Sequence, residues 1–206
     1  MNKKIIHDAL ILTAFTLVLG FILGMVYDIT KEPIEKVNYE ITQAAYQQVF
    51  SDADSFETLE FDKDEAASLM EKEGYKDTID DIQTVYDSSK AVMGYVITVT
   101  ANDGSQGSIT FSVGIRNDGT VNGYSITDIS ETPGLGIKAK DEEFYSQFEN
   151  KLVEKFEVVK QAVTQEENEM GKVEAITGST ITSKAMANGC NSAIFYFKTK
   201  LVGGAE

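Results

Sequence analysis

Two short segments carry residues whose types and spacing could support chemistry. The first runs from Glu174 to Ser183, reads EAITGSTITS and crowds five hydroxyl side chains around Gly178. Hydroxyl residues before a helix usually cap its N-terminus, but a cap needs only one of them. Free N–H groups and the helix dipole also favour an anion at such a position, so the segment is either a capped helix start or a phosphate site near Thr180. The five hydroxyl residues are Thr177, Ser179, Thr180, Thr182 and Ser183.

The second segment, residues 131–136, reads ETPGLG and follows a stretch that predicts a strand. Pro133 fixes φ at the first central position of a turn, and Gly134 can adopt the positive φ that a type II turn requires at the second. Gly136 adds a point at which backbone can approach a ligand closely. The segment is therefore either a plain turn after a strand or a loop that presents Leu135 and bare N–H groups to a flat ligand.

The composition excludes several other kinds of chemistry. Among 206 residues there is one cysteine, Cys190, which excludes an intramolecular disulfide framework and a cysteine-ligated iron–sulfur cluster. The single histidine, His7, excludes most zinc, haem and histidine-based catalytic sites. A net charge of −15 argues against a nucleic-acid partner, and no metal site is expected. Any redox chemistry must therefore come from a cofactor.

The elements that position the two segments predict an α+β fold with an antiparallel sheet. Strands are predicted for residues 91–101, 108–115 and 121–130, because β-branched and aromatic residues alternate there. Turn signals at residues 102–104 and 117–119 join these strands into a three-stranded meander. Helical spacing predicts helices at residues 33–50, 64–73, 77–83, 141–152 and 183–200, and a further strand is expected within residues 155–163.

The N-terminal segment predicts a membrane anchor. Residues 9–27 form an uncharged stretch of 19 residues, preceded by Lys3 and Lys4. The residues that follow make a poor signal-peptidase site, which favours an uncleaved single-pass anchor over a cleaved signal or a buried core helix. Equal numbers of lysines flank the uncharged stretch on its two sides, so charge does not decide its orientation. The long C-terminal domain can be translocated regardless of charge. We expect residues 1–8 in the cytoplasm and the domain on the extracytoplasmic face of the cell membrane.

Between the anchor and the sheet lies a strongly acidic stretch. Residues 1–36 carry no net charge, so the whole charge of −15 belongs to residues 37–206. Residues 52–87 contain 13 acidic side chains and three lysines, which indicates a solvated face or a docking surface for a basic partner. We therefore expect a linker helix and acidic helical segment over residues 28–87 and the main domain over residues 88–206.

The two segments resemble the signatures of covalent FMN-binding domains. TGST at residues 177–180 is similar to the motif [Ser/Thr]-Gly-[Ala/Ser]-Thr, whose last threonine carries FMN through a phosphoester bond, and ETPGLG is similar to the second signature. The likeness covers about residues 88–200 and implies that Thr180 carries the flavin. Glu174 stands where the modifying flavin transferase reads an acidic residue that is usually aspartate.

The resemblance also implies roles for the neighbouring residues. Lys138 either offsets the phosphate charge or is simply a solvated lysine. Cys190 is expected to be a small buried hydrophobe rather than a redox thiol. The phosphate loop would comprise Thr177, Gly178 and Ser179, with Thr182 and Ser183 bonding to the phosphate, and the flavin would be lined by Glu131, Thr132, Gly134, Leu135 and Gly136.

Two kinds of membrane subunit carry such a domain behind an anchor. They are the G subunit of the Rnf ferredoxin:NAD oxidoreductase and the C subunit of the sodium-pumping NADH:quinone reductase. One anchor and a compact insert make this chain more similar to the former. The resemblance implies an electron relay, one electron at a time, within a complex that exports Na⁺ or H⁺, with the other subunits and the flavin transferase as partners. A stand-alone extracytoplasmic flavoprotein and a membrane-anchored scaffold without flavin are the alternatives.

Overall fold

The computed structural model describes residues 3–202. The expectations that fall on Met1 and Asn2, and on residues 203–206, lie outside the described part. The chain divides into two compact units, one ending at Thr42 and the other beginning at Gln43. Each unit is described by itself.

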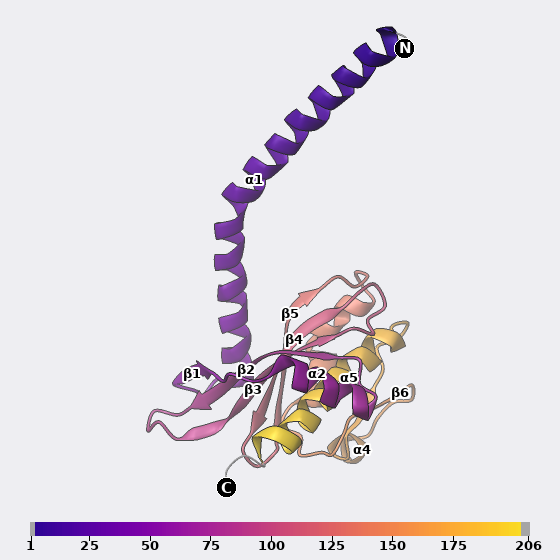
Figure 1. Cartoon of the computed structure of the whole chain (residues 1–206). Coiled ribbons are helices and arrows are strands. Elements are labelled where there is room, and N and C mark those ends of the chain that lie inside the picture. The colour runs from indigo at the N-terminus through magenta and orange to yellow at the C-terminus, as the bar shows by residue number, and fades with distance from the viewer. Residues whose placement is uncertain (1–2, 203–206) are drawn as a thin grey trace. The chain divides into compact units, whose positions relative to one another are not determined.

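The first unit is the greater part of a continuous helix, α1 (Lys3–Val49), drawn in indigo and purple in Figure 1. The predicted helix over residues 33–50 is confirmed as its C-terminal part. Pro33 lies inside the helix and lacks the N–H group that would bond to the carbonyl of Ile29. Large apolar side chains of the N-terminal half are exposed, and the helix is long and apolar enough to cross a membrane.

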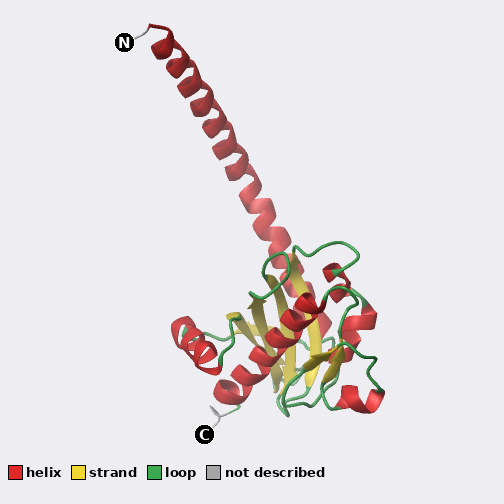
Figure 2. Ribbon diagram, turned by 90° about the vertical axis from the view of Figure 1, so that its right-hand side faces the viewer, coloured by secondary structure: helices red, strands yellow, loops and turns green. Residues whose placement is uncertain are grey.

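The second unit is built on a five-stranded antiparallel meander in sequence order (Figure 2). The three predicted strands are confirmed as β3 (Val92–Ala101), β4 (Ile109–Arg116) and β5 (Val121–Ile129). Two strands precede them, β1 (Ser55–Thr58) and β2 (Thr78–Tyr86). The expected helix at residues 77–83 is therefore wrong, because this stretch forms most of β2.

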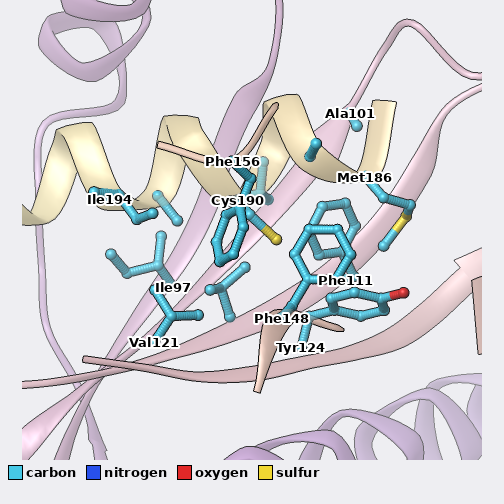
Figure 3. Packing of buried hydrophobic residues seen from close by; sticks show 14 of the residues in the cluster. Ile97, Ala101, Phe111, Val121, Tyr124, Phe148, Phe156, Met186, Cys190 and Ile194 are labelled. Atoms are coloured by element: carbon cyan, nitrogen blue, oxygen red, sulfur yellow. The ribbon is translucent and has the colours of Figure 1, made fainter. Parts of the chain in front are cut away.

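Helix α5 (Thr180–Tyr196) lies across one face of this sheet (Figure 2). Figure 3 shows Met186, Cys190 and Ile194 of α5 packed over Ile97 and Phe111 of the sheet. Gly189 allows the close approach, because an added Cβ would lie 2.5 Å from the ring of Phe111. The end of α1 belongs to a second, smaller core cluster of Tyr46, Val49, Phe50, Val85 and Val96.

The predicted C-terminal helix is confirmed, although it begins three residues earlier than residue 183 and ends in a π-helical turn, η3 (Phe197–Leu201). The predicted helix at residues 64–73 is confirmed as α2 (Lys63–Glu73), which Asp62 caps. The strand expected within residues 155–163 is β6 (Glu157–Val159), paired in parallel with β7 (Lys172–Glu174). Helix α4 (Gln165–Glu169) lies between them in sequence.

The helix predicted for residues 141–152 is much shorter in the structure. It comprises α3 (Glu142–Tyr145) and the 3₁₀ turn η2 (Ser146–Phe148), and another 3₁₀ turn, η1 (Gly136–Lys140), precedes it. Helical geometry cannot continue because Asn150 adopts a φ of 56° and Lys151 forms a β-bridge with Val121. Phe144 and Phe148 are nevertheless both buried, as their spacing of four residues predicts.

Candidate functional site

Three loops meet at the N-terminal end of α5 and enclose a pocket of about 260 Å³. They are the β3–β4 loop, the segment between β5 and η1, and the segment between β7 and α5. The structure thus brings together most of the residues that the sequence predicts for the site. Those that line the pocket are Glu131, Thr132, Leu135, Gly136, Gly178, Ser179, Thr180 and Thr182.

The segment from Thr132 to Leu135 forms the expected turn. The N–H of Leu135 donates to the carbonyl of Thr132 at 3.1 Å, and Gly134 has a φ of 76°. These features, with Pro133 at the first central position, are those of a type II turn. The turn leaves the Leu135 side chain 41% exposed at the pocket.

Gly136 is required because its neighbours fill the space that a side chain would need. An ideal Cβ on Gly136 would lie 2.6 Å from Glu131 Oε2 and 2.8 Å from Thr182 Oγ1. Its backbone conformation is not in the positive-φ region, so the requirement for glycine is purely steric. One oxygen of each of these two side chains therefore packs closely against Gly136.

The loop that carries Thr180 bends at Gly178, which has a φ of 80°. An ideal Cβ on Gly178 would lie 3.2 Å from Leu135 Cδ2, so the two signature segments approach each other closely at this point. Thr180 is the first residue of α5, and Ser179, which precedes it, makes no side-chain capping bond. N–H groups in the first turn of a helix lack intrahelical partners, which leaves donors for an anion beside Thr180.

Ser183 holds this loop closed from inside. Its fully buried Oγ accepts a hydrogen bond from the N–H of Ile176 at 3.0 Å and donates to the carbonyl of Ser179 at 2.9 Å. A serine hydroxyl has one hydrogen, and here it is committed to Ser179. Donation from Ser183 to a phosphate, as the resemblance implies, is therefore not what this geometry provides.

The hydroxyl of Thr182, unlike that of Ser183, has no hydrogen-bond partner among the described residues. The Thr182 side chain is 1% exposed. An unsatisfied hydroxyl in such a place costs free energy, and native proteins rarely leave one without a reason. Because Thr182 lines the pocket, a ligand group placed there would supply the missing partner.

Glu131 links the β3–β4 loop to the turn. The residue is 5% exposed, and its Oε1 accepts hydrogen bonds from the N–H groups of Ser105 at 2.6 Å and Gln106 at 3.3 Å. Ser105 thereby becomes a wall of the pocket. Sequence reasoning missed Ser105, because the Asn-Asp-Gly turn signal just before it predicts only a hairpin.

Ile181 also lines the pocket and was missed. Its side chain is 58% exposed, although it is a large apolar residue next to a polar loop. The signal was its position directly after Thr180, on the first turn of the helix and outside the core-facing stripe. Together with Leu135 it gives the pocket two exposed apolar walls.

The remaining nominated residues lie outside this pocket. Lys138 and Thr177 line a second pocket of about 390 Å³, together with Glu174. Gly178, the residue after Thr177, lines the first pocket instead, and Lys138 is exposed. Gly134 lies at the tip of its turn and Ser183 inside the loop.

Cys190 packs as expected of a small buried hydrophobe. It is fully buried under α5, and burial raises the pKa of its thiol well above the ordinary value, with the charge of Asp77 adding to the effect. Within residues 3–202, no group of three or more His, Cys, Asp or Glu side chains is placed to hold a metal ion.

The pocket suits a ligand that is anionic at one end and flat and apolar at the other. The start of α5 and the orphaned hydroxyl of Thr182 supply donors for an anion, while Leu135 and Ile181 offer apolar surface. Glycines at positions 136 and 178 keep side chains out of the space between these walls. FMN has this combination of groups, so the residues present fit it.

Comparison with known proteins decides the family. Residues 104–194 match the FMN-binding domain, and residues 1–49 match the RnfG N-terminal region. The chain is 32% identical over 195 residues to the G subunit of the Na⁺-translocating ferredoxin:NAD⁺ oxidoreductase complex of Acetobacterium woodii, covering 93% of this chain and 91% of that protein. The chain belongs to this G-subunit family. The expected resemblance is confirmed.

A second relative supports this assignment, and a solved structure supports the fold. The G subunit of the proton-translocating ferredoxin:NAD⁺ oxidoreductase complex of Clostridium ljungdahlii is 30% identical over 183 residues, covering 89% of this chain and 86% of that protein. NqrC of Shewanella oneidensis has a TM-score of 0.51 and 23% identity over 58% of each chain, a likeness that supports the fold alone. The G-subunit family is thus supported along almost the whole chain, and the C-subunit alternative only at the level of the fold.

Proposed function

We propose that this chain is the membrane-anchored FMN carrier of an ion-translocating ferredoxin:NAD⁺ oxidoreductase complex. In this proposal FMN is joined to Thr180 by a phosphoester bond and relays electrons one at a time between ferredoxin and NAD⁺. The observation that carries it is the pocket at the start of α5, where Thr180 lies beside the orphaned hydroxyl of Thr182. The names of the relatives, whose complexes translocate Na⁺ or protons, support the assignment to the complex.

The chain's own residues would hold the phosphate in three ways. Free N–H groups at the start of α5 would bond to the phosphate oxygens, and the helix dipole favours a negative group there. Thr182 would donate its hydroxyl hydrogen, which satisfies a side chain that is otherwise unpaired. Ser183 would fix the loop through Ile176 and Ser179, so that Thr180 keeps one position.

The apolar walls would position the flavin body. Leu135 and Ile181 would cover flat apolar surface and exclude water from it, and the glycine at position 136 would let the backbone come close. FMN, when bound, supplies one-electron redox chemistry that the side chains of this protein do not. The protein would contribute position, orientation and a fixed electrostatic environment.

Attachment requires a second protein. Thr180 Oγ would form a bond to the phosphorus of an FMN unit activated as a phosphoanhydride. The anhydride P–O bond would break, the leaving phosphate would take the electron pair, and the hydroxyl proton would pass to a base. A flavin transferase supplies such chemistry, and the exposed Glu174, three residues before Thr177, would be part of what it reads.

Residues 9–27 would anchor the carrier in the cell membrane as a single span. In this arrangement residues 1–8 are cytoplasmic, residues 28–87 follow the anchor and contribute β1 and β2 to the sheet, and the FMN-binding domain over residues 88–206 lies with these strands on the extracytoplasmic face. The length and apolar character of α1 support a span.

Covalent flavin provides the direct test. The chain co-expressed with a flavin transferase should fluoresce as a flavoprotein in a denaturing gel, and Thr180→Ala should not. Thr199→Ala, a hydroxyl deletion at an exposed site on η3, is the matched control and should retain the flavin. A wild-type chain without flavin would favour a scaffold instead, and undiminished flavin in Thr180→Ala would contradict the attachment site.

The place in the complex needs a separate measurement. Membranes from cells that lack this chain should lose ferredoxin:NAD⁺ oxidoreductase activity and regain it with wild type but not with Thr180→Ala. Intact activity without the chain would favour a stand-alone flavoprotein.

A further inference from the structure

Glu131 is a buried carboxylate that has no counter-ion among the described residues. It is 5% exposed, and no lysine or arginine in the described part of the chain forms an ion pair with it. Acidic side chains are rarely buried so completely unless they are paired. Its hydrogen bonds come from two backbone N–H groups, of Ser105 and Gln106.

The two carboxylate oxygens have different surroundings. Oε1 holds the β3–β4 loop, because both N–H groups donate to it. Oε2 packs closely against Gly136, as Thr182 Oγ1 does, because an ideal Cβ on this glycine would lie 2.6 Å from the first oxygen and 2.8 Å from the second. Glu131, Thr182 and Thr180 all line the same pocket, so Glu131 forms part of the wall of the pocket in which the flavin is proposed to bind.

We infer that Glu131 lowers the redox midpoint potential of the flavin by holding a fixed negative charge against the pocket. This inference rests on the proposed function. Electrons that reach the flavin from a one-electron carrier of a partner subunit, and leave to another, add negative charge while they reside there. A nearby buried carboxylate opposes that charge more strongly than a solvated one, because the surroundings screen it less.

The charge of Glu131 can be removed without removing its hydrogen-bond acceptor. Glu131→Gln removes the charge but keeps the size of the side chain and a carbonyl oxygen that can accept from Ser105 and Gln106. Glu131→Asp keeps the charge and shortens the side chain. Glu149→Gln removes one negative charge from a half-buried position that does not line the pocket, and it is the matched control.

The experiment is a spectroelectrochemical titration of the full chain, loaded by co-expressed flavin transferase and purified in detergent. We expect the flavin midpoint potential of Glu131→Gln to be more positive than that of wild type. The shift in Glu149→Gln should be clearly smaller, and Glu131→Asp should remain closer to wild type than Glu131→Gln does. Flavin content measured by absorbance should be similar in all four proteins.

The outcomes separate this inference from the proposed function. A wild-type chain that takes up no flavin contradicts the proposed function itself. Loaded wild type with equal potentials in Glu131→Gln and Glu149→Gln overturns the inference and leaves the carrier function standing. Glu131→Gln should fold, because the glutamine preserves an acceptor for the bonds to the β3–β4 loop.

Discussion

The hydroxyl of Ser183 accepts the N–H of Ile176 at a distance of 3.0 Å, across the loop that carries Thr180. Both residues are buried, so water cannot replace this bond. The same hydroxyl donates to the carbonyl of Ser179, which closes the loop from its two ends. The position of Thr180 therefore depends on a serine that lies one helical turn further along the chain.

Ser183→Ala should destabilise the protein by about 1–3 kcal/mol, because it leaves a buried N–H group on Ile176 without a partner. Urea unfolding followed by circular dichroism measures this loss. Thr199→Ala removes an exposed hydroxyl bond to the carbonyl of Phe195 and should change stability far less. Equal stability of the two variants would show that the loop does not depend on Ser183.

Thr182→Val should act in opposite directions on the empty and the loaded protein. In a Thr180→Ala background, which should carry no flavin, valine replaces an unsatisfied hydroxyl and should raise stability by about 1 kcal/mol. With Thr180 intact, the same change should slow flavin incorporation, because a donor to the phosphate is lost. Thermal unfolding and the rate of incorporation check the two halves, and an unchanged rate would contradict the role of Thr182.

Strand β2 illustrates where sequence patterns mislead. Its buried apolar residues Ile79, Ile82 and Val85 are spaced by three, which resembles one face of a helix. The register shifts between Ile79 and Asp81, where a bulge interrupts the alternation expected of a strand. The bulge brings Ile79 and Ile82 into one core cluster, whereas Val85 belongs to the other, and pairing with β1 and β3 reveals the element as a strand. The strands β3, β4 and β5 could be predicted because β-branched and aromatic residues alternate along them and because clear turn signals lie between them.

Some features of the site could likewise be predicted from the sequence, and others could not. The sequence could predict the turn at Gly134 and the polar start of α5, because glycine, proline and hydroxyl residues carry local conformational information. It could not distinguish Ser183, which bonds inward, from Thr182, which is unpaired, since both are hydroxyls at the start of one helix. Ser105 was missed because its position depends on Glu131, which is distant in sequence.

Gly136→Ala should be more damaging than Gly134→Ala, although the two glycines lie only two residues apart. An added methyl group at position 136 would lie 2.6 Å from Glu131 Oε2, so it must displace that side chain, at a cost of about 1–3 kcal/mol. Position 134 has open space, so alanine there meets only the strain of a φ of 76°, which costs about 1–2 kcal/mol. Flavin content should fall in the first variant and persist in the second; the reverse order would contradict the pocket geometry.

Cys190 should resist alkylation in the folded protein. Its side chain is fully buried, and burial raises the pKa of the thiol, so very little of the reactive thiolate is present at pH 8. Modification by iodoacetamide should begin only near the urea concentration that unfolds the domain. Thr199→Cys, with an exposed second thiol, should add one rapidly labelled group in native buffer, and rapid labelling of Cys190 itself would be inconsistent with its position under α5.

Asp77 should make the protein less stable as pH rises from acidic to neutral. Its carboxylate is 6% exposed and accepts a hydrogen bond from Ser192 Oγ at 2.5 Å. Burial raises its pKa above the ordinary value of 3.8, and the nearby charge of Asp103 adds to this, while the bond from Ser192 acts in the opposite direction. The folded chain therefore keeps this proton to higher pH than the unfolded chain.

The folded state binds this proton more tightly than the unfolded state does. The free energy of unfolding therefore falls as the pH rises from 3.8 to the raised pKa of Asp77, and it stays lower above that pKa. Asp77→Asn stays neutral and retains an acceptor for Ser192. It should be more stable than wild type at pH 7, and the difference should vanish below about pH 4. Urea unfolding at several pH values measures this, with the exposed Glu57→Gln as control. A variant less stable than wild type at pH 7 would mean that the ionised carboxylate contributes more through its hydrogen bonds than its burial costs.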